Sequence, residues 1–94
     1  MIQHIVMWKF RPDAQKEADE FLSRLAALKD QIPYIRSMYV RRSAVENSSY
    51  DAVLVSEFDS LEDVHRYRED PRHQAVSALC KSIRTNRCAI DIEL

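Results

Sequence analysis

The length and composition of the chain indicate one small soluble domain. Its 94 residues are 46% hydrophobic and 31% charged, which are the proportions of an ordinary globular protein. The formal net charge is −1 and the pI is near 6.3. A nucleic-acid-binding domain usually carries a basic face and a high pI, so we expect no nucleic-acid partner. No apolar run approaches the roughly 20 residues of a membrane span, so we expect no membrane association.

The cysteines and the absence of glycine set two further expectations. Cys80 and Cys88 form no CxxC pair, so we interpret both as free thiols of a cytoplasmic protein. Because the chain contains no glycine, any turn that needs a positive φ must use Asn, Asp or Ser. In the turn Glu46–Ser49, Asn47 is the best candidate for that conformation.

The first predicted element is a strand, Ile2–Phe10, which is rich in β-branched and aromatic residues. Both of its faces carry large apolar side chains, which indicates a central strand covered on both sides. One face holds His4, Val6 and Trp8.

A long helix follows this strand. Asp13 is its predicted N-cap, and apolar residues recur at helical spacing as far as Leu28. The helix should end near Gln31, because Ile32 precedes Pro33 and a residue before proline disfavours the α conformation.

Two more strands are predicted in the middle of the chain. Tyr34–Val45 is less apolar, and its pair Arg41-Arg42 suits a solvated edge strand. Asp51–Phe58 contains a run that is apolar on both faces, so we expect it to be central in the sheet.

The last third of the chain predicts two helical segments and a strand. Ser60 and Asp63 fit a capping box for a short helix that turns Leu61 and Val64 inward and ends before Pro71. A second helical segment should run from Arg72 to about Ser82 and the last strand from Thr85 to Glu93. The stripe expected on the second segment consists of His73, Val76, Leu79, Cys80 and Ile83.

The order of these elements is β-α-β-β-α-β, which predicts an α+β, ferredoxin-like protomer with an antiparallel sheet and a single domain over residues 1–94. Right-handed crossovers place the first and third strands in the middle. The helices cover one face of that sheet, yet Ile5, Met7, Val53 and Val55 lie on the other. Such an apolar face is larger than monomers usually expose, so we expect a homodimer through the sheet faces, forming an α/β barrel.

Two segments resemble the stress-responsive A/B barrel domain family, often called Dabb. The first strand, Ile2-Gln3-His4-Ile5-Val6-Met7-Trp8-Lys9-Phe10, is similar to the family pattern H-x-V-x-x-K-F. Tyr67-Arg68-Glu69-Asp70-Pro71-Arg72-His73 resembles the pattern Y-x-x-[HD]-P-x-H. The resemblance extends over essentially the whole chain and implies a dimeric α/β barrel.

The resemblance also implies candidate site residues. Some family members are polyketide cyclases in which a tyrosine and a histidine of the late motif act together, and these correspond to Tyr67 and His73. His73 would serve as a base near neutral pH, and Tyr67 would donate a hydrogen bond to an oxyanion. Such chemistry requires no metal and no cofactor. The predicted ligand-binding residues are His4, Val6, Trp8, Leu54 and Arg68.

Two residues argue against carrying over a cyclase substrate. Asp70 replaces the histidine of the family motif, and it could either hold His73 by its charge or cap the next helix. Arg68 falls near the centre of the stripe defined by Leu61 and Val64, so either the helix ends before it or an arginine borders the cavity. An arginine there would favour a carboxylate or a phosphate. Ser56 and Arg84 point weakly in the same direction.

Three functional hypotheses remain open from the sequence. The first is a dimer that binds a small molecule in a pocket between helices and sheet. The second is a cofactor-free lyase, isomerase or cyclase with His73 and Tyr67 as its catalytic residues. The third is a structural or stress-protective oligomer without a ligand. The histidines lack HxH, HxxxH and HExxH spacing, so no metal site is expected, and His65 should lie in solvent.

Overall fold

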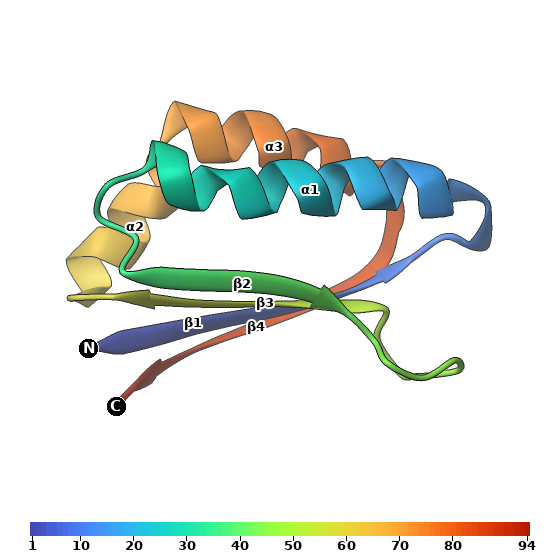
Figure 1. The fold of residues 1–94 in the computed structure, drawn as a ribbon, viewed down its shortest axis with the longest axis horizontal. Helices are drawn as coiled ribbons and strands as arrows, with labels where there is room; N and C mark the ends of the chain where they lie inside the picture. Colours follow the sequence, from blue (N-terminus) through green and yellow to red (C-terminus); the bar gives the residue numbers. More distant parts are fainter.

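The computed structural model describes all residues, 1–94, as a four-stranded sheet with helices on one face (Figure 1). The predicted α+β, ferredoxin-like architecture is confirmed. The elements in chain order are β1 (Ile2–Phe10), the 3₁₀ turn η1 (Pro12–Ala14), α1 (Gln15–Gln31), β2 (Ser37–Arg42), β3 (Ala52–Phe58), α2 (Leu61–Glu69), α3 (Pro71–Lys81) and β4 (Arg84–Glu93).

The strand order is β2-β3-β1-β4, and all three pairings are antiparallel. The two most apolar strands, β1 and β3, therefore occupy the centre, as predicted. The less apolar β2 and β4 form the edges.

The register aligns residues of three strands in rows across the face beneath the helices. His4 lies opposite Asp91 of β4 and Ser56 of β3, and Trp8 lies opposite Arg87. Alternate residues of a strand point to opposite faces. The polar residues Asp91 and Arg87 thus share the inner face with His4 and Trp8.

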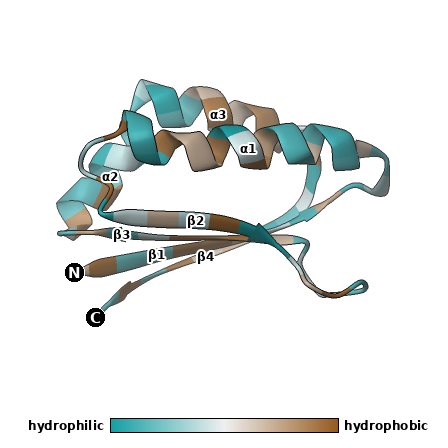
Figure 2. Cartoon of the chain, viewed as in Figure 1, coloured by the Kyte–Doolittle hydropathy of each residue, from teal (hydrophilic) through white to brown (hydrophobic).

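The core fills the space between this inner face and the helices. α1 buries residues at helical spacing, Phe21 and Leu25 among them, and Trp8 meets Phe21 edge-on with ring centroids 5.3 Å apart. Hydrophobic residues run along the strands beneath the helices, whereas α1 and α3 carry hydrophilic stretches (Figure 2). Burying one large apolar side chain contributes roughly 1.5–3 kcal/mol, so this layer dominates the stability of the fold.

The outer face of the sheet is apolar and has no cover within the chain (Figure 1). Ile5 and Met7 of β1 and Val55 of β3 are half-buried there, and Ile90 and Tyr39 on the edge strands are 57% and 49% exposed.

Several local predictions were right. Asn47 adopts φ 60°, which makes it the residue with positive φ that the glycine-free turn requires. Of the predicted capping box, the Ser60 half is present: its hydroxyl accepts a hydrogen bond from the Asp63 N–H at 3.2 Å and caps α2. Cys80 and Cys88 are both free. His65 is exposed.

Other local predictions were wrong. Asp13 does not cap α1, because η1 precedes the helix and Ala14 occupies the N-cap position. β2 is shorter than Tyr34–Val45, since the chain needs the residues around Ile35 to descend from α1 to the edge of the sheet. Leu61 is 52% exposed because it starts α2 outside the contact with the sheet, and Leu79 on α3 is 36% exposed.

Candidate functional site

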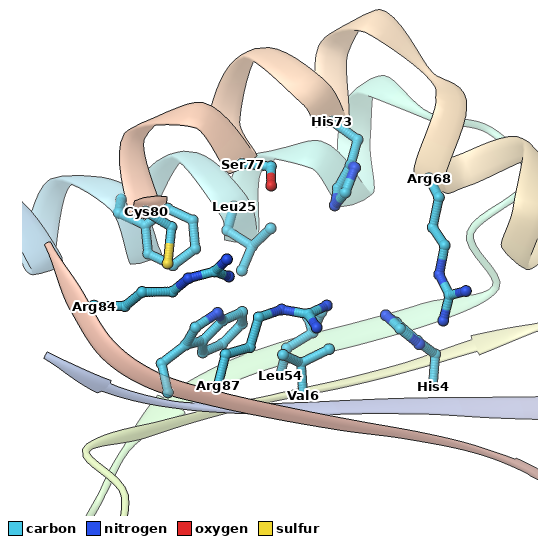
Figure 3. Close-up of a pocket in the computed structure, with 12 residues that line it drawn as sticks. His4, Val6, Leu25, Leu54, Arg68, His73, Ser77, Cys80, Arg84 and Arg87 are labelled. Carbon is cyan, nitrogen blue, oxygen red and sulfur yellow. The ribbon is translucent and has the colours of Figure 1, made fainter. Parts of the chain in front are cut away.

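A cavity of about 80 Å³ lies between the sheet and the helices α1 and α3 (Figure 3). Half of its wall is hydrophobic, and the other half carries histidine, serine and arginine side chains. The lining residues are His4, Val6, Trp8, Phe21, Leu25, Leu54, Arg68, His73, Ser77, Cys80, Arg84 and Arg87. All five residues predicted to bind a ligand lie on this wall, and so does His73.

His4 lies on the floor of the cavity, on the inner face of β1, and is only 2% exposed. Its Nδ1 lies 2.5 Å from Oδ1 of Asp91 on β4, and Arg68 donates to the other carboxylate oxygen at 2.8 Å. Burial lowers the pKa of His4, and the Asp91 carboxylate opposes that effect only in part. A neutral His4 with an ionised Asp91 carries its proton on Nδ1, because a carboxylate can only accept. Its Nε2 is then available to accept a hydrogen bond or a proton.

His73 enters the cavity from the first turn of α3 (Figure 3). Its Nδ1 is buried and has no hydrogen-bond partner. Burial lowers the pKa of His73 as well, so both cavity histidines are neutral at pH 7. A neutral imidazole with an unused buried nitrogen can accept a proton or bind a polar ligand atom.

Tyr67 lies behind His73 and does not form part of the cavity wall. The two rings are 4.3 Å apart between centroids, and Tyr67 is fully buried. Its hydroxyl has no hydrogen-bond partner, and burial raises its pKa far above the usual value. The structure brings the motif pair together, but it is the imidazole that reaches the cavity.

Asp70 caps α3, which is one of the two roles considered for it. Its carboxylate accepts from the backbone N–H of Arg72 at 2.9 Å and from the Tyr34 hydroxyl at 3.2 Å. The guanidinium of Arg72 holds the pKa of Asp70 well below its usual range. Ser56, the other polar residue suggested by the sequence, is buried and donates to the His4 carbonyl instead of lining the cavity.

Three guanidinium groups reach the cavity, from Arg68, Arg84 and Arg87 (Figure 3). Arg68 is paired with Asp91, whereas neither Arg84 nor Arg87 has a carboxylate within 4 Å. Burial lowers the pKa of Arg87, and the neighbouring Arg84 and Arg68 lower it further. Arg87 was missed from the sequence. Its alternation with Asp91 along the last strand could have placed it on the inner face.

No group of three or more His, Cys, Asp or Glu side chains is arranged to hold a metal ion. No helix is long and apolar enough to cross a membrane. The groups that can take part in chemistry at this site are two neutral imidazoles, the Asp91 carboxylate that orients His4, and three guanidinium cations beside an apolar wall.

The fold and the site define a small α+β protein with a ferredoxin-like sheet and a cavity beneath its helices. The sequence profile described as the stress responsive A/B barrel domain (Dabb) matches residues 2–94, and the chain belongs to this family. The resemblance noted from the two motifs is thereby confirmed.

Solved structures with the same fold cover nearly the whole chain. A dimeric protein of unknown function with a ferredoxin-like fold from Bacteroides fragilis is 28% identical, with a TM-score of 0.90, and the match covers 99% of this chain and 95% of that one. A Dabb family protein from Mesorhizobium loti is 20% identical, with a TM-score of 0.81 and coverage of 99% and 95%.

Some of the similar structures are named as enzymes. A hydroxynitrile lyase from Passiflora edulis is 13% identical, with a TM-score of 0.86, and the match covers 99% of this chain and 92% of that one. At this identity the likeness concerns the fold alone. No curated protein matches the sequence.

Proposed function

We propose that this protein is a homodimer that binds a compact small molecule in the cavity between helices and sheet. The observation that carries the proposal is His73, an imidazole on the cavity wall whose Nδ1 is buried without a hydrogen-bond partner. A buried polar atom without a partner costs about 1–3 kcal/mol, and a ligand that bonds to it recovers this free energy.

The volume of the cavity limits the ligand. It measures about 80 Å³, well below the roughly 300 Å³ of pockets for drug-sized ligands, because Trp8, Phe21 and Leu25 narrow it. An outer depression of about 440 Å³ shares Arg68, His73 and Ser77 with the cavity. A ligand would place a small head inside, and any longer part would extend into the depression. A folded polyketide chain is too large for the interior.

The homodimer follows from the uncovered outer face of the sheet. Ile5, Met7 and Ile90 form an apolar hollow there, and the Bacteroides fragilis protein is described as dimeric. We place the partner subunit on this face, sheet against sheet. Ile90→Glu would bury a charge in that interface, so we expect monomers by light scattering after gel filtration, whereas the exposed Glu62→Gln control should remain dimeric. A dimeric Ile90→Glu protein would contradict this arrangement.

Ligand binding can be tested by screening small polar metabolites for an increase in melting temperature. A ligand of the cavity should stabilise the parent protein and the exposed-site control His65→Ala equally. It should stabilise His73→Ala less, because the atom that it satisfies is gone. Equal stabilisation of all three proteins would exclude His73 from the site. A complete absence of ligands would favour the structural oligomer.

A second candidate function is cofactor-free acid–base catalysis, as in a lyase or isomerase. The specific observation is the pair of His4 and Asp91, which leaves Nε2 of a neutral imidazole facing a cavity that also holds His73. Either ring can take a proton from a carbon acid, and Arg68 or Arg87 can stabilise the resulting oxyanion. Tyr67 remains a predicted donor that would need to reorient to reach the substrate.

Proton exchange provides the test of that chemistry. Weak carbon acids should exchange a C–H for deuterium in the presence of the protein, as followed by NMR. His73→Gln and His4→Gln should each lower the exchange rate by roughly 10²-fold or more. Exchange that is unaffected by both substitutions would refute catalysis in this cavity.

A further inference from the structure

We propose that the ligand of this cavity is a compact organic carboxylate whose carboxylate group binds between Arg84 and Arg87. This inference rests on the proposed function, because it names the chemical class that the same cavity selects. Arg84 starts β4 on the side of the cavity away from Arg68, and the Arg87 guanidinium, from further along β4, is drawn between the two (Figure 3).

The charges around the cavity are unbalanced. Three guanidinium groups and no carboxylate line it, and Asp91, which contacts two of the lining residues, is already bonded to both His4 and Arg68. Arg84 and Arg87 have no carboxylate within 4 Å. His4 and His73 are neutral at pH 7, so they leave this excess of positive charge unchanged. The free protein thus holds two uncompensated cations against an apolar wall.

Both cations belong to elements that hold them in place. Arg84 is the first residue of β4, directly after the buried Ile83, whose carbonyl accepts from Arg11 at 2.8 Å. Arg87 is three residues further on and pairs with Trp8 in the register of the sheet. The Arg87 residue is exposed as a whole, yet its guanidinium turns inward to the cavity (Figure 3). Burial lowers the pKa of Arg87, and the positive charges of Arg84 and Arg68 lower it further.

An anion between these two groups would relieve the repulsion and supply the missing hydrogen-bond acceptors. Guanidinium groups match a planar carboxylate with two parallel hydrogen bonds. The remaining wall favours an organic anion over inorganic phosphate, because Val6, Trp8, Leu25 and Leu54 offer apolar surface. With the carboxylate at Arg84 and Arg87, the body of the ligand would lie over Val6 and Leu54.

The outer depression that leads toward the site is positively charged, like the inner end of the cavity. Lys81 lines the outer depression together with Arg68, and this depression shares His73 and Ser77 with the cavity wall. Positive charge at a mouth raises the local concentration of anions and speeds their association. The whole route from solvent to the inner arginines therefore favours a negatively charged ligand.

The test compares benzoate with benzamide, which has nearly the same shape and no charge, and with inorganic phosphate. In calorimetric titrations we expect benzoate to bind at least about tenfold more tightly than benzamide, with an affinity that falls as salt is added. Benzamide binding as tightly as benzoate would overturn the carboxylate assignment while leaving the cavity as a small-molecule site. Phosphate binding more tightly than benzoate would also overturn it, as would a lack of benzoate binding.

Variants locate the anion. Arg87→Gln and Arg84→Gln should each weaken benzoate about tenfold and leave benzamide unchanged, whereas Arg24→Gln on the exposed side of α1 removes the same charge without effect. Arg87→Gln should also raise the melting temperature of the ligand-free protein, since it removes an uncompensated cation. Equal losses of benzoate and benzamide would indicate a folding defect and contradict a charge-specific role.

Discussion

At the scale of single residues, His4, Asp91 and Arg68 form a chain of contacts that joins β1, β4 and α2. Asp91 accepts from both neighbours, one on each carboxylate oxygen. This double acceptance fixes the orientation of the His4 ring and leaves its Nε2 toward the cavity. Arg68 was expected to make the pocket basic, but its charge is largely neutralised by the ion pair with Asp91. Arg84 and Arg87 carry the charge that remains.

Replacing Asp91 by Asn should lower the pKa of His4. The carboxylate raises that pKa against the effect of burial, so its removal leaves burial unopposed. Titration of the ring by ¹⁵N NMR measures the shift, with the exposed Glu62→Gln variant as a charge control. An increase in the pKa of His4 in Asp91→Asn would be incompatible with the assigned contact.

Replacing Tyr67 by Phe should leave the protein as stable or stabilise it by up to about 1 kcal/mol. The buried hydroxyl has no partner, and its removal abolishes a desolvation penalty without changing the packing of the ring. Urea unfolding measures the difference, and Tyr39→Phe on an exposed ring is the control. A loss of more than about 1 kcal/mol would reveal a partner for the hydroxyl, as the role of an oxyanion donor would require.

At the scale of elements, the junction between α2 and α3 depends on one carboxylate. Asp70 caps α3 and accepts from Tyr34, while Arg72 spans from Asp70 to the Gln31 carbonyl at the end of α1. The junction orients α3, and α3 supplies His73 and Ser77 to the cavity. The proline of the family motif follows directly at the first position of α3, where its missing N–H leaves no bond unmade.

Asp70→Ala should destabilise the protein by about 1–2 kcal/mol, the usual effect of losing an N-cap. Asp70→Asn keeps an acceptor for the Arg72 N–H and should recover part of this loss. Chemical unfolding of the two variants beside the parent provides the comparison. An Asp70→Ala protein with the stability of the parent would show that the cap is not a significant support of α3.

The sequence predicted the elements well because hydrophobic periodicity determines which segments pair. The apolar runs in Ile2–Phe10 and Asp51–Phe58 indicated the two central strands, and the alternation along the first placed His4, Val6 and Trp8 on one face. Local sequence signals predicted less well where tertiary contacts determine the end of an element. Asp13 has the chemistry of a cap, but the proline before it starts a 3₁₀ turn that moves the helix start to Gln15.

The candidate site was predicted only in part, because local patterns do not specify how the elements pack together. Family motifs and strand alternation identify His4 and His73, but they do not show which side chains leave a space between them. The alternation of Arg87 with Asp91 could have given its face of the sheet, but its position beside the cavity follows from the pairing with Trp8, which the sequence does not show. The position of Tyr67 behind His73 depends on the angle between α2 and α3, which no local pattern specifies.

At the scale of the whole molecule, the buried histidines make stability depend on pH. The pKa values of His4 and His73 are lowered from 6.5 in the folded chain, so the unfolded chain binds more protons as pH falls below about 6.5. Their contribution to stability is fully present above pH 6.5 and is lost progressively as pH falls toward their folded pKa values.

We therefore expect the free energy of unfolding to decrease between pH 7.5 and about 5.5, before the carboxylates titrate. The double variant His4→Gln/His73→Gln should have a flatter profile over that interval, and the exposed His65→Gln serves as the matched control. Urea unfolding at each pH gives the profile. A parent protein with constant stability across the interval would refute the lowered pKa values.

The alternation of side chains along β1 has a consequence for communication between subunits. His4, Val6 and Trp8 face the cavity, while Ile5 and Met7, one residue away, lie on the proposed dimer face. A ligand that shifts this strand would change the free energy of dimerisation. By thermodynamic reciprocity, dimerisation would change the free energy of ligand binding by the same amount. The dissociation constant of the dimer should then change with benzoate by the same factor by which dimerisation changes the affinity for benzoate. A single strand would thus couple assembly to occupancy, with no hinge or domain movement.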